Sequence, residues 1–262
     1  RLEALGDDAA KKLISQVAMI DWKVVESIKD KAEDKGDAKK IEPLAAVEIN
    51  DIKKNKEKYT AKGVETIKNG KLAAVLLAGG QGTRLGLDKP KGTLNVGVNK
   101  DLFLFGQLIH NLMDVVNQTG AWVPLYIMTS DKNNKDTVEF FEEHNYFGYD
   151  KDYVKFFIQS MVPSVDYNGK LYMESTDSLA MSPNGNGGWF LSLIAAGLDK
   201  DMQDKGIEYV NVFAVDNILQ RIADPAFIGA TILAGAECGS KVVRKCEPAE
   251  KVGVMCKVNG HP

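Results

Sequence analysis

The sequence predicts an α/β protein with a mostly parallel β-sheet, and three observations support this fold class. From Lys71 onward, apolar runs of strand length alternate with amphipathic stretches of helix length. The first apolar run, residues 71–78, leads directly into a glycine-rich loop. The chain has 262 residues, which is long enough to bury such a sheet between two layers of helices.

Each expected element follows from its local pattern. Residues 1–70 are predicted as an N-terminal helical segment, with a charge-rich linker at 29–40 and a second helix from about Asp51 to Lys68. The apolar stripe of its first helix consists of Leu13, Val17, Ile20, Val24 and Ile28. Residues 71–262 are predicted as the sheet-containing core. Its strands are expected at 71–78, 122–130, 154–159, 169–174, 207–217, 240–246 and 251–258, and its helices at 101–120, 133–145, 186–200 and 224–235.

Composition excludes several classes of protein. The formal net charge is −3, so bulk electrostatics gives no reason to expect nucleic-acid binding. The sequence has no apolar run near the ~18 residues that a membrane span needs. Three cysteines, Cys238, Cys246 and Cys256, show no CxxC spacing. An odd number of scattered cysteines favours reduced core thiols in a cytoplasmic protein.

The loop after the first strand has the composition of a phosphate-binding loop. Gly79, Gly80 and Gly82 allow backbone N–H groups to approach a ligand closely, and Arg84 and Lys91 add two cations. Together they indicate a polyphosphate ligand, the alternative being a simple turn with solvated charges. The Walker A pattern is absent. The dinucleotide pattern G-x-G-x-x-G has Leu in place of its third glycine. That alternative stays open because the pattern is also followed by a second strand and an acidic residue, which Asp101 could supply.

Four stretches in order resemble one known family. They are "LAGGQGTRLGLDKPKG" (77–92), "FFIQSMVP" (156–163), "SPNGNGG" (182–188) and "VDNILQRIADP" (215–225). All four resemble motifs of the UDP-sugar pyrophosphorylases, the UTP:sugar-1-phosphate uridylyltransferases. The likeness is greater to the branch that makes UDP-N-acetylglucosamine or UDP-N-acetylgalactosamine than to the UDP-glucose branch, whose glycine core differs. It extends over nearly the whole chain.

The resemblance implies a Rossmann-like nucleotidyltransferase core and a role for each motif. UTP and a sugar 1-phosphate would react to give a UDP-sugar and pyrophosphate, with Mg²⁺ as the cofactor. Arg84 and Lys91 would clamp the triphosphate and the leaving pyrophosphate, Gln159 would read uracil, and Asp216 would bind Mg²⁺. The residues that the resemblance assigns to nucleotide binding are Ala78, Gly79, Gly80, Gly82, Thr83, Gln159, Gly185 and Asn186.

The sequence also departs from the family. The segment "TLNVGVNKDLFLFGQ" (93–107) is shorter than its counterpart in better-known members, which leaves nucleotide preference open. Family members continue beyond the point matched by Pro262, so we expect a longer protein whose sugar-binding half follows this chain. We therefore expect the chain to bind UTP and to transfer uridylyl poorly. Within the family, a UDP-glucose or broad-specificity UDP-sugar pyrophosphorylase is the alternative. A non-catalytic nucleotide-binding module and a dinucleotide-dependent oxidoreductase are the alternatives of another class, and the sequence carries no signal for oligomeric state.

Overall fold

The computed structural model describes residues 5–23, 25–26, 40–81, 86 and 88–261. In this part of the chain two compact units form. The sheet unit consists of residues 47–160 and 185–243, and the second unit of residues up to 46, 161–184 and from 244 onward. This division differs from the predicted boundary at residue 70, because residues 47–70 join the sheet unit and two later segments join the N-terminal residues.

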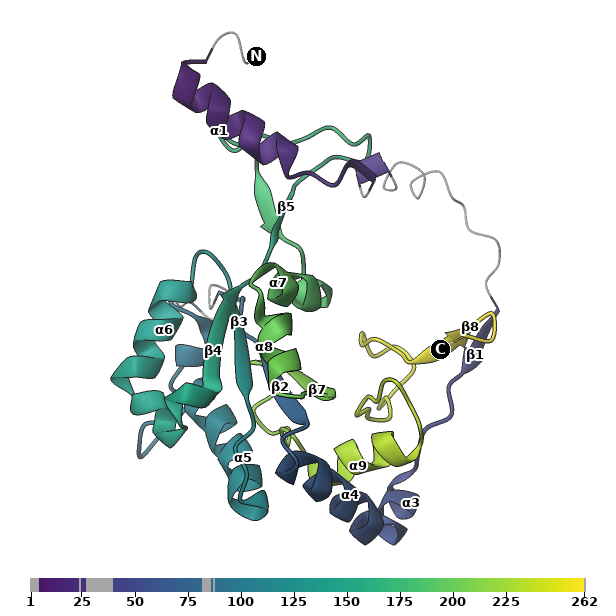
Figure 1. Ribbon diagram of the computed structural model, residues 1–262. Helices are drawn as coiled ribbons and strands as arrows, with labels where there is room; N and C mark the ends of the chain where they lie inside the picture. Colours follow the sequence, from purple (N-terminus) through teal and green to yellow (C-terminus); the bar gives the residue numbers. More distant parts are fainter. Residues whose placement is uncertain (1–4, 24, 27–39, 82–85, 87, 262) are drawn as a thin grey trace. The chain divides into compact units, whose positions relative to one another are not determined.

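The sheet unit is built on parallel strands. These are β2 (Leu72–Leu77), β3 (Leu125–Thr129), β4 (Val154–Ile158) and β7 (Tyr209–Ala214). They pair in the order β4-β3-β2-β7, and every pairing is parallel (Figure 1). Because the strands point the same way, the loops that follow them meet at one edge of the sheet. The predicted α/β class with a mostly parallel sheet is confirmed.

Helices connect and cover these strands. In chain order they are α3 (Ile49–Lys54), α4 (Lys56–Lys68), α5 (Leu104–Thr119), α6 (Asn134–Glu143), α7 (Trp189–Ala195), α8 (Leu198–Asp204) and α9 (Pro225–Leu233). Short 3₁₀ turns are η3 (Lys91–Thr93), η4 (Asn145–Gly148), η5 (Lys151–Tyr153) and η6 (Asn186–Gly188).

Successive side chains of β2 enter two different apolar clusters. Leu76 packs with Leu112 of α5 and Phe213 of β7 on one face, whereas its neighbour Val75 packs with Leu193 of α7 on the other. This alternation is the two-residue period of a strand. Burial on both faces explains why the strand reads as one continuous apolar run.

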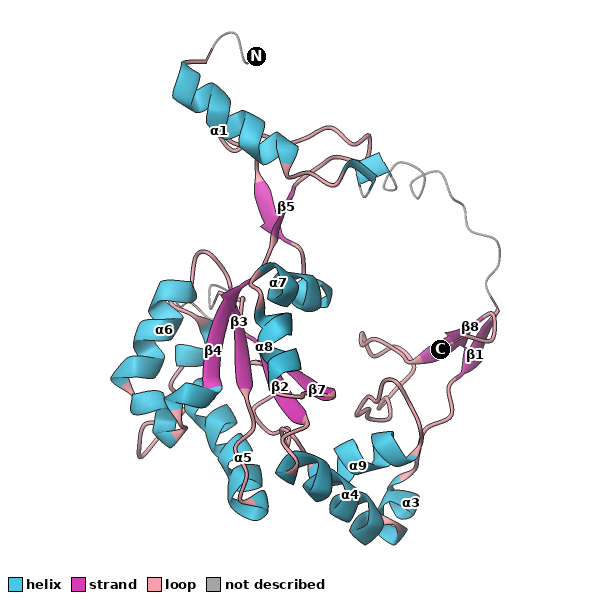
Figure 2. Cartoon of the chain, in the orientation of Figure 1, coloured by secondary structure: helices cyan, strands magenta, loops and turns pink. Residues whose placement is uncertain are grey.

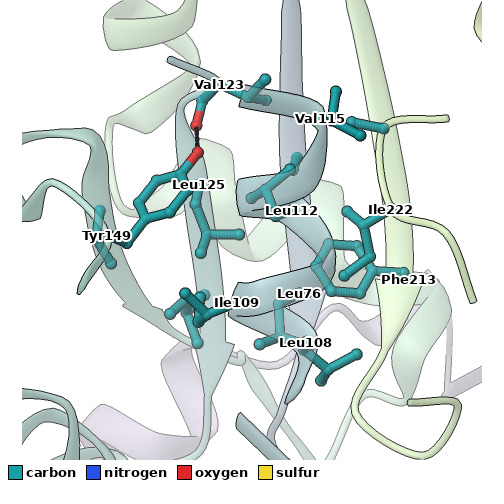
Figure 3. Close-up of a cluster of buried hydrophobic side chains, with 14 of the residues drawn as sticks. Leu76, Leu108, Ile109, Leu112, Val115, Val123, Leu125, Tyr149, Phe213 and Ile222 are labelled. Carbon is teal, nitrogen blue, oxygen red and sulfur yellow. Dashed lines mark hydrogen bonds between the residues drawn. The ribbon is translucent and has the colours of Figure 1, made fainter. Parts of the chain in front are cut away.

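Figure 3 shows part of the larger cluster, which lies between β2, β3 and α5. At its margin the hydroxyl of Tyr149 donates a 2.6 Å hydrogen bond to the carbonyl of Val123. Burial is the main cause that raises the pKa of Tyr149, so this phenol stays a neutral donor. The polar end of a core aromatic side chain is thereby satisfied.

Helices α4 and α9 pack in direct backbone contact. A side chain at Gly63 of α4 would overlap the backbone of Pro225, and one at Gly229 of α9 would overlap the carbonyl of Tyr59. Glycine at both positions permits this approach. The contact fixes α9, and with it the segment that leads from β7 into α9.

The second unit contains α1 (Asp7–Ala18), the antiparallel pair β5 (Met161–Pro163) and β6 (Met181–Pro183), and the antiparallel pair β1 (Ile41–Pro43) and β8 (Cys256–Val258). Leu13 and Ile20 share an apolar cluster with Leu179. The main-chain N–H of Leu179 donates to the Gln16 side chain at 2.9 Å. The predicted helical stripe is confirmed at Leu13 and Val17, whereas Ile20 joins the cluster from beyond the end of α1 and members 24 and 28 lie outside the described residues.

Several predicted elements differ in the structure. Residues 240–246 form a loop and not a strand, and of 251–258 only β8 is a strand (Figure 2). Val242 and Val243 are 55% and 93% exposed. An alternating pattern forms a strand only where a partner strand satisfies its backbone groups, and here none pairs with it among the described residues. Residues 169–174 likewise make only isolated bridges.

Two predicted helices are each divided. Asn55 separates α3 from α4, and Gly197 separates α7 from α8. Gly197 has φ +71°, a left-handed conformation that ends an α-helix. The predicted stop at Asn69-Gly70 is confirmed, since α4 ends at Lys68 and Gly70 has φ +68°.

The cysteines are free thiols, but the prediction that they lie in the core is wrong. Cys238 and Cys246 are exposed and Cys256 is half-buried. Cys238 and Cys246 lie in loop segments, and the strand expected at 240–246 does not form, whereas Cys256 begins the short strand β8. A search of the described helices finds none with the length and apolarity needed to cross a membrane.

Candidate functional site

The predicted site residues of the sheet unit cluster at the C-terminal edge of the sheet. Ala78 follows β2, Gln159 follows β4 and Asp216 lies two residues beyond β7. In an open parallel sheet this edge is where ligands bind. The sheet therefore brings together residues that lie up to about 140 positions apart in the sequence.

The two ends of the glycine-rich loop are fastened to each other. Gln81 and Pro90 form an antiparallel bridge, and the N–H of Lys91 donates to the carbonyl of Gly80 at 3.5 Å. On the sheet side, the N–H of Ala78 donates to Met128 at 2.8 Å. Three predicted ligand-binding residues, Gly82, Thr83 and Arg84, lie outside the described residues.

Asn133, which directly precedes α6 in the segment after β3, supports the start of this loop. Its side chain is fully buried, and it accepts from the N–H of Ser130 at 2.7 Å. Its amide donates to the carbonyls of Ala78 and Gly80 at 3.0 and 3.4 Å. Sequence analysis missed this residue. The available signal was an Asn at the first position of a predicted helix, a place that usually reports only helix capping.

Gln159 is held between two glycines. Its side chain is almost completely buried, and its Nε2 donates to the carbonyl of Gly185 at 2.8 Å. A Cβ atom added at Gly79 would lie 2.7 Å from Oε1 of Gln159, so any larger residue there would displace the amide. Gly185 has φ +81°, which favours glycine. Gln159 thus lies against two other residues predicted to bind the nucleotide, and Asn186 begins the exposed turn η6 directly after Gly185.

Lys91 and Asp216 form an ion pair across the ends of β2 and β7. Nζ of Lys91 lies 2.5 Å from Oδ1 of Asp216, and their side chains are 30% and 62% exposed. The predicted phosphate-binding cation and the predicted metal-binding carboxylate are therefore in direct contact. Among the described residues no group of three or more His, Cys, Asp or Glu side chains could hold a metal ion without help from a ligand.

The turn that carries Lys91 rests on the core. Gly92 is buried against the ring of Phe105 in α5, and a side chain at Gly92 would overlap Cζ, Cε1 and Cε2 of that ring. Phe105 in turn contacts Phe141 of α6, with ring centroids 5.0 Å apart. Close packing of Gly92 on Phe105 therefore fixes the backbone of the turn that carries Lys91.

Comparison with known proteins shows which family the chain belongs to. Residues 21–262 match the family model described as UTP–glucose-1-phosphate uridylyltransferase. The chain belongs to this family. It is 44% identical over 211 residues to the mouse (Mus musculus) UDP-N-acetylhexosamine pyrophosphorylase-like protein 1, an alignment that covers 78% of this chain and 42% of that protein.

Two further members support the assignment. The UDP-N-acetylglucosamine pyrophosphorylase of Saccharomyces cerevisiae is 40% identical over 218 residues, covering 82% of this chain and 46% of that protein. A crystal structure of the uridine diphosphate N-acetylglucosamine pyrophosphorylase from Trypanosoma brucei, in complex with an inhibitor, matches with a TM-score of 0.84 at 30% identity, covering 99% of this chain and 56% of that one. The chain spans about half the length of the curated relatives it matches.

These matches confirm the family predicted from the four motifs and the nucleotidyltransferase fold. The roles of the individual site residues stay predictions. What the structure adds is that Gly79, Gln159 and Gly185 form one contact group and that Lys91 and Asp216 form another.

Proposed function

We propose that this chain is the nucleotide-binding half of an enzyme that converts UTP and a sugar 1-phosphate into a UDP-sugar and pyrophosphate. The sugar is proposed to be an N-acetylhexosamine, because the relatives described above carry N-acetylhexosamine or N-acetylglucosamine in their names. The observation that carries the proposal is the Lys91–Asp216 pair at the same sheet edge as the buried amide of Gln159.

Gln159 suits a uracil base for chemical reasons. Uracil presents two acceptor carbonyls and one N–H donor, and a glutamine amide offers both a donor and an acceptor. The bond from Nε2 to Gly185 fixes the orientation of the amide, and Gly79 gives Oε1 its space. A rigid amide discriminates between bases because a wrong base would leave a buried polar group unpaired.

Lys91 suits the phosphate chemistry. In the proposed reaction a phosphate oxygen of the sugar 1-phosphate attacks the α-phosphorus of UTP, and the bond to the β-phosphate breaks to release pyrophosphate. Catalysis of such a transfer consists mainly of positioning and charge stabilisation. Lys91, held by the packing of Gly92 on Phe105, supplies a preorganised cation at the loop that follows β2. The proposed partner of Lys91 in this task, residue 84, lies outside the described residues.

Mg²⁺ is proposed as the cofactor, and Asp216 is the residue that would hold it. One largely exposed carboxylate fits a hard ion that takes its remaining ligands from phosphate and water oxygens. When bound, the ion would neutralise phosphate charge. Because Nζ of Lys91 contacts Oδ1 of Asp216, the proposed cation and the proposed metal-holding carboxylate would face the same phosphates.

Partners and location follow from the same observations. We propose no nucleic-acid or membrane partner, given the net charge of −3 and the absence of any long apolar helix among the described residues. A cytoplasmic location is proposed from the free thiols.

A ligand panel tests the proposal against its two alternatives. Thermal unfolding of the chain is measured with UTP, CTP, ATP, NADH and NADPH, each with and without Mg²⁺, since a ligand that binds the native state raises the melting temperature. We expect the largest shift with UTP and Mg²⁺. A shift with NADH or NADPH and none with UTP would favour the oxidoreductase and refute the proposal.

Activity is tested separately. Pyrophosphate release is followed with UTP, Mg²⁺ and either N-acetylglucosamine 1-phosphate or glucose 1-phosphate, using a protein that includes the sugar-binding half. Faster release with the N-acetylated sugar supports the proposed substrate class. UTP binding without release from either sugar would identify a non-catalytic nucleotide-binding module.

A further inference from the structure

The loop that follows Asp216 is fastened to helix α5 by one side chain. Nδ2 of Asn111 donates to the carbonyl of Ile218 at 2.8 Å and to the carbonyl of Gln220 at 3.2 Å. Asn111 lies 107 and 109 positions before these residues in the sequence. Both accepting carbonyls lie within four residues of Asp216, so Asn111 restrains the part of the loop that begins at the carboxylate.

The amide of Asn111 has a defined orientation. Nε2 of Gln107, one helical turn earlier, donates to Oδ1 of Asn111 at 3.1 Å. Because Oδ1 accepts this bond, the two N–H donors of Asn111 face the loop, and each has its own carbonyl. Gln107 and Asn111 thus form a directed chain of hydrogen bonds from the helix to the loop.

The remaining contacts hold the loop at its other points. Nε2 of Gln220 donates to the carbonyl of Ala214 at 3.2 Å, which returns the loop to the end of β7. The N–H of Ala223 donates to Oδ1 of Asn211 at 2.8 Å, and Ala223 has φ +51°, a conformation that a non-glycine residue keeps only when its surroundings hold it. Between these points Leu219 is 91% exposed. Its neighbour Ile218 packs against the apolar core cluster, so apolar packing and these hydrogen bonds hold the loop together.

Helix α5 supports both members of the ion pair. Phe105 of α5 carries the turn of Lys91 through Gly92, and Asn111 of the same helix carries the loop of Asp216. The two positions on α5 are six residues apart. One rigid helix thereby restrains both a cation and a carboxylate that lie in segments following different strands.

We propose that Asn111 is a positioning residue for the proposed uridylyl transfer: by binding the carbonyls of Ile218 and Gln220 it sets Asp216 at the place where its carboxylate meets Lys91 and the nucleotide phosphates. The expected effect on UTP binding rests on the proposed function, since a misplaced Asp216 would weaken Mg²⁺-dependent binding of UTP. The expected effect on the order of the loop does not rest on that function.

The first test measures UTP binding by calorimetry in the presence and absence of Mg²⁺. Asn111→Ala removes both donors, and Asn111→Asp keeps the shape while removing them. Asn117→Ala is the matched control, because Asn117 is an exposed asparagine of the same helix. We expect both Asn111 variants to weaken Mg²⁺-dependent UTP binding by about tenfold, the effect of losing roughly 1.4 kcal/mol, and the control to bind as wild type does.

A double mutant separates positioning from general stability. If Asn111 acts through Asp216, then Asn111→Ala should have no further effect on UTP binding in the Asp216→Asn background. A role that is only structural would weaken binding by the same factor in both backgrounds. Equal factors would therefore overturn the proposal.

The second test does not depend on UTP. Hydrogen exchange of the backbone amides of residues 217–223 is compared between wild type, Asn111→Asp and Asn117→Ala. We expect at least tenfold faster exchange in this loop with Asn111→Asp and no change with Asn117→Ala. Unchanged exchange in Asn111→Asp would overturn the proposal, whether or not UTP binds. A wild-type chain that does not bind UTP would refute the proposed function, and the exchange result would then decide the role of Asn111.

Discussion

Replacing Gly92 with alanine should disturb the turn that carries Lys91. Gly92 is buried, and the added methyl group would overlap three ring carbons of Phe105, well inside the ~3.5–4.0 Å of an ordinary carbon–carbon contact. The ring has no room to withdraw, because Phe105 is fully buried and packs against Phe140 and Phe141 at centroid distances of 6.3 and 5.0 Å. The turn itself must therefore move away from α5.

The expected effect has two components. Overpacking a dense core costs about 1–3 kcal/mol, and in a protein of this size 1 kcal/mol lowers the melting temperature by roughly 2–4 °C. Displacement of the turn also moves Nζ of Lys91 from the proposed phosphate site, and losing a hydrogen bond to a charged group costs about 1.5–3 kcal/mol. We therefore expect UTP affinity to fall by about tenfold or more.

The assay pairs unfolding with binding. Melting temperature and UTP affinity are measured for Gly92→Ala, Phe105→Leu and the double variant. The smaller leucine should make room for the methyl group, so the double variant should recover part of the UTP affinity that Gly92→Ala loses. Gly187→Ala is the control for unfolding, because a Cβ atom at Gly187 meets nothing within 4 Å.

Two results would refute this reasoning. A Gly92→Ala variant with wild-type melting temperature and UTP affinity would show that the turn tolerates a side chain. If the effects of the two substitutions on melting temperature and UTP affinity were additive in the double variant, Gly92 and Phe105 would not be coupled.

Three other predictions concern single residues. Gln159→Ala should weaken UTP binding and reduce the preference for UTP over CTP, measured by competitive calorimetry; an unchanged preference would mean that another group reads the base. Asp216→Asn should keep the melting temperature within about 1 °C, as surface substitutions do, but should lose the Mg²⁺ dependence of UTP binding; a wild-type Mg²⁺ titration would assign Asp216 to the turn alone. Asp201 should contribute acid-sensitive stability: burial opposes its ionisation, but hydrogen bonds from Lys155, Lys205 and Tyr126 outweigh burial and hold the pKa of its carboxyl below the usual range. Because the folded-state pKa lies below the unfolded-state pKa of about 3.9, the ionised carboxylate stabilises the fold above that pH, and this stabilisation is lost as the pH falls below it. The melting temperature of Asp201→Asn should therefore fall less than that of wild type between pH 5 and pH 3. Equal falls in the two melting temperatures would contradict this.

Much of the fold follows from local sequence patterns. The strand β2 and the glycines after it were predictable because a buried parallel strand is a continuous apolar run, and a close-approach loop needs glycine wherever a side chain would collide. The family could be recognised because its motifs are short and contiguous. Helix ends at Asn69-Gly70 and at Gly120 follow from the left-handed conformations of the glycines, with φ +68° and +69°.

Two elements were predicted wrongly because they depend on tertiary contacts that local sequence patterns do not show. Residues 240–246 have the alternation of a strand, but a strand depends on a neighbour that may lie anywhere in the chain, and in the structure this segment is an exposed loop. The break between α7 and α8 depends on one glycine, which lowers helix propensity without by itself ending a helix. Local propensity was informative in both cases and tertiary context overrode it.

The sequence by itself determined the class of the fold, the family and the residue types at the site, because each of these is written in contiguous patterns of apolar, glycine and charged residues. Only the tertiary structure decided which of those residues meet. Gln159 fits between Gly79 and Gly185, and Lys91 reaches Asp216, because parallel strands that are distant in sequence end at one edge of the sheet. The supporting roles of Asn133 and Asn111 were likewise set by tertiary structure, since an asparagine amide acquires its role from the carbonyls that packing brings within its reach.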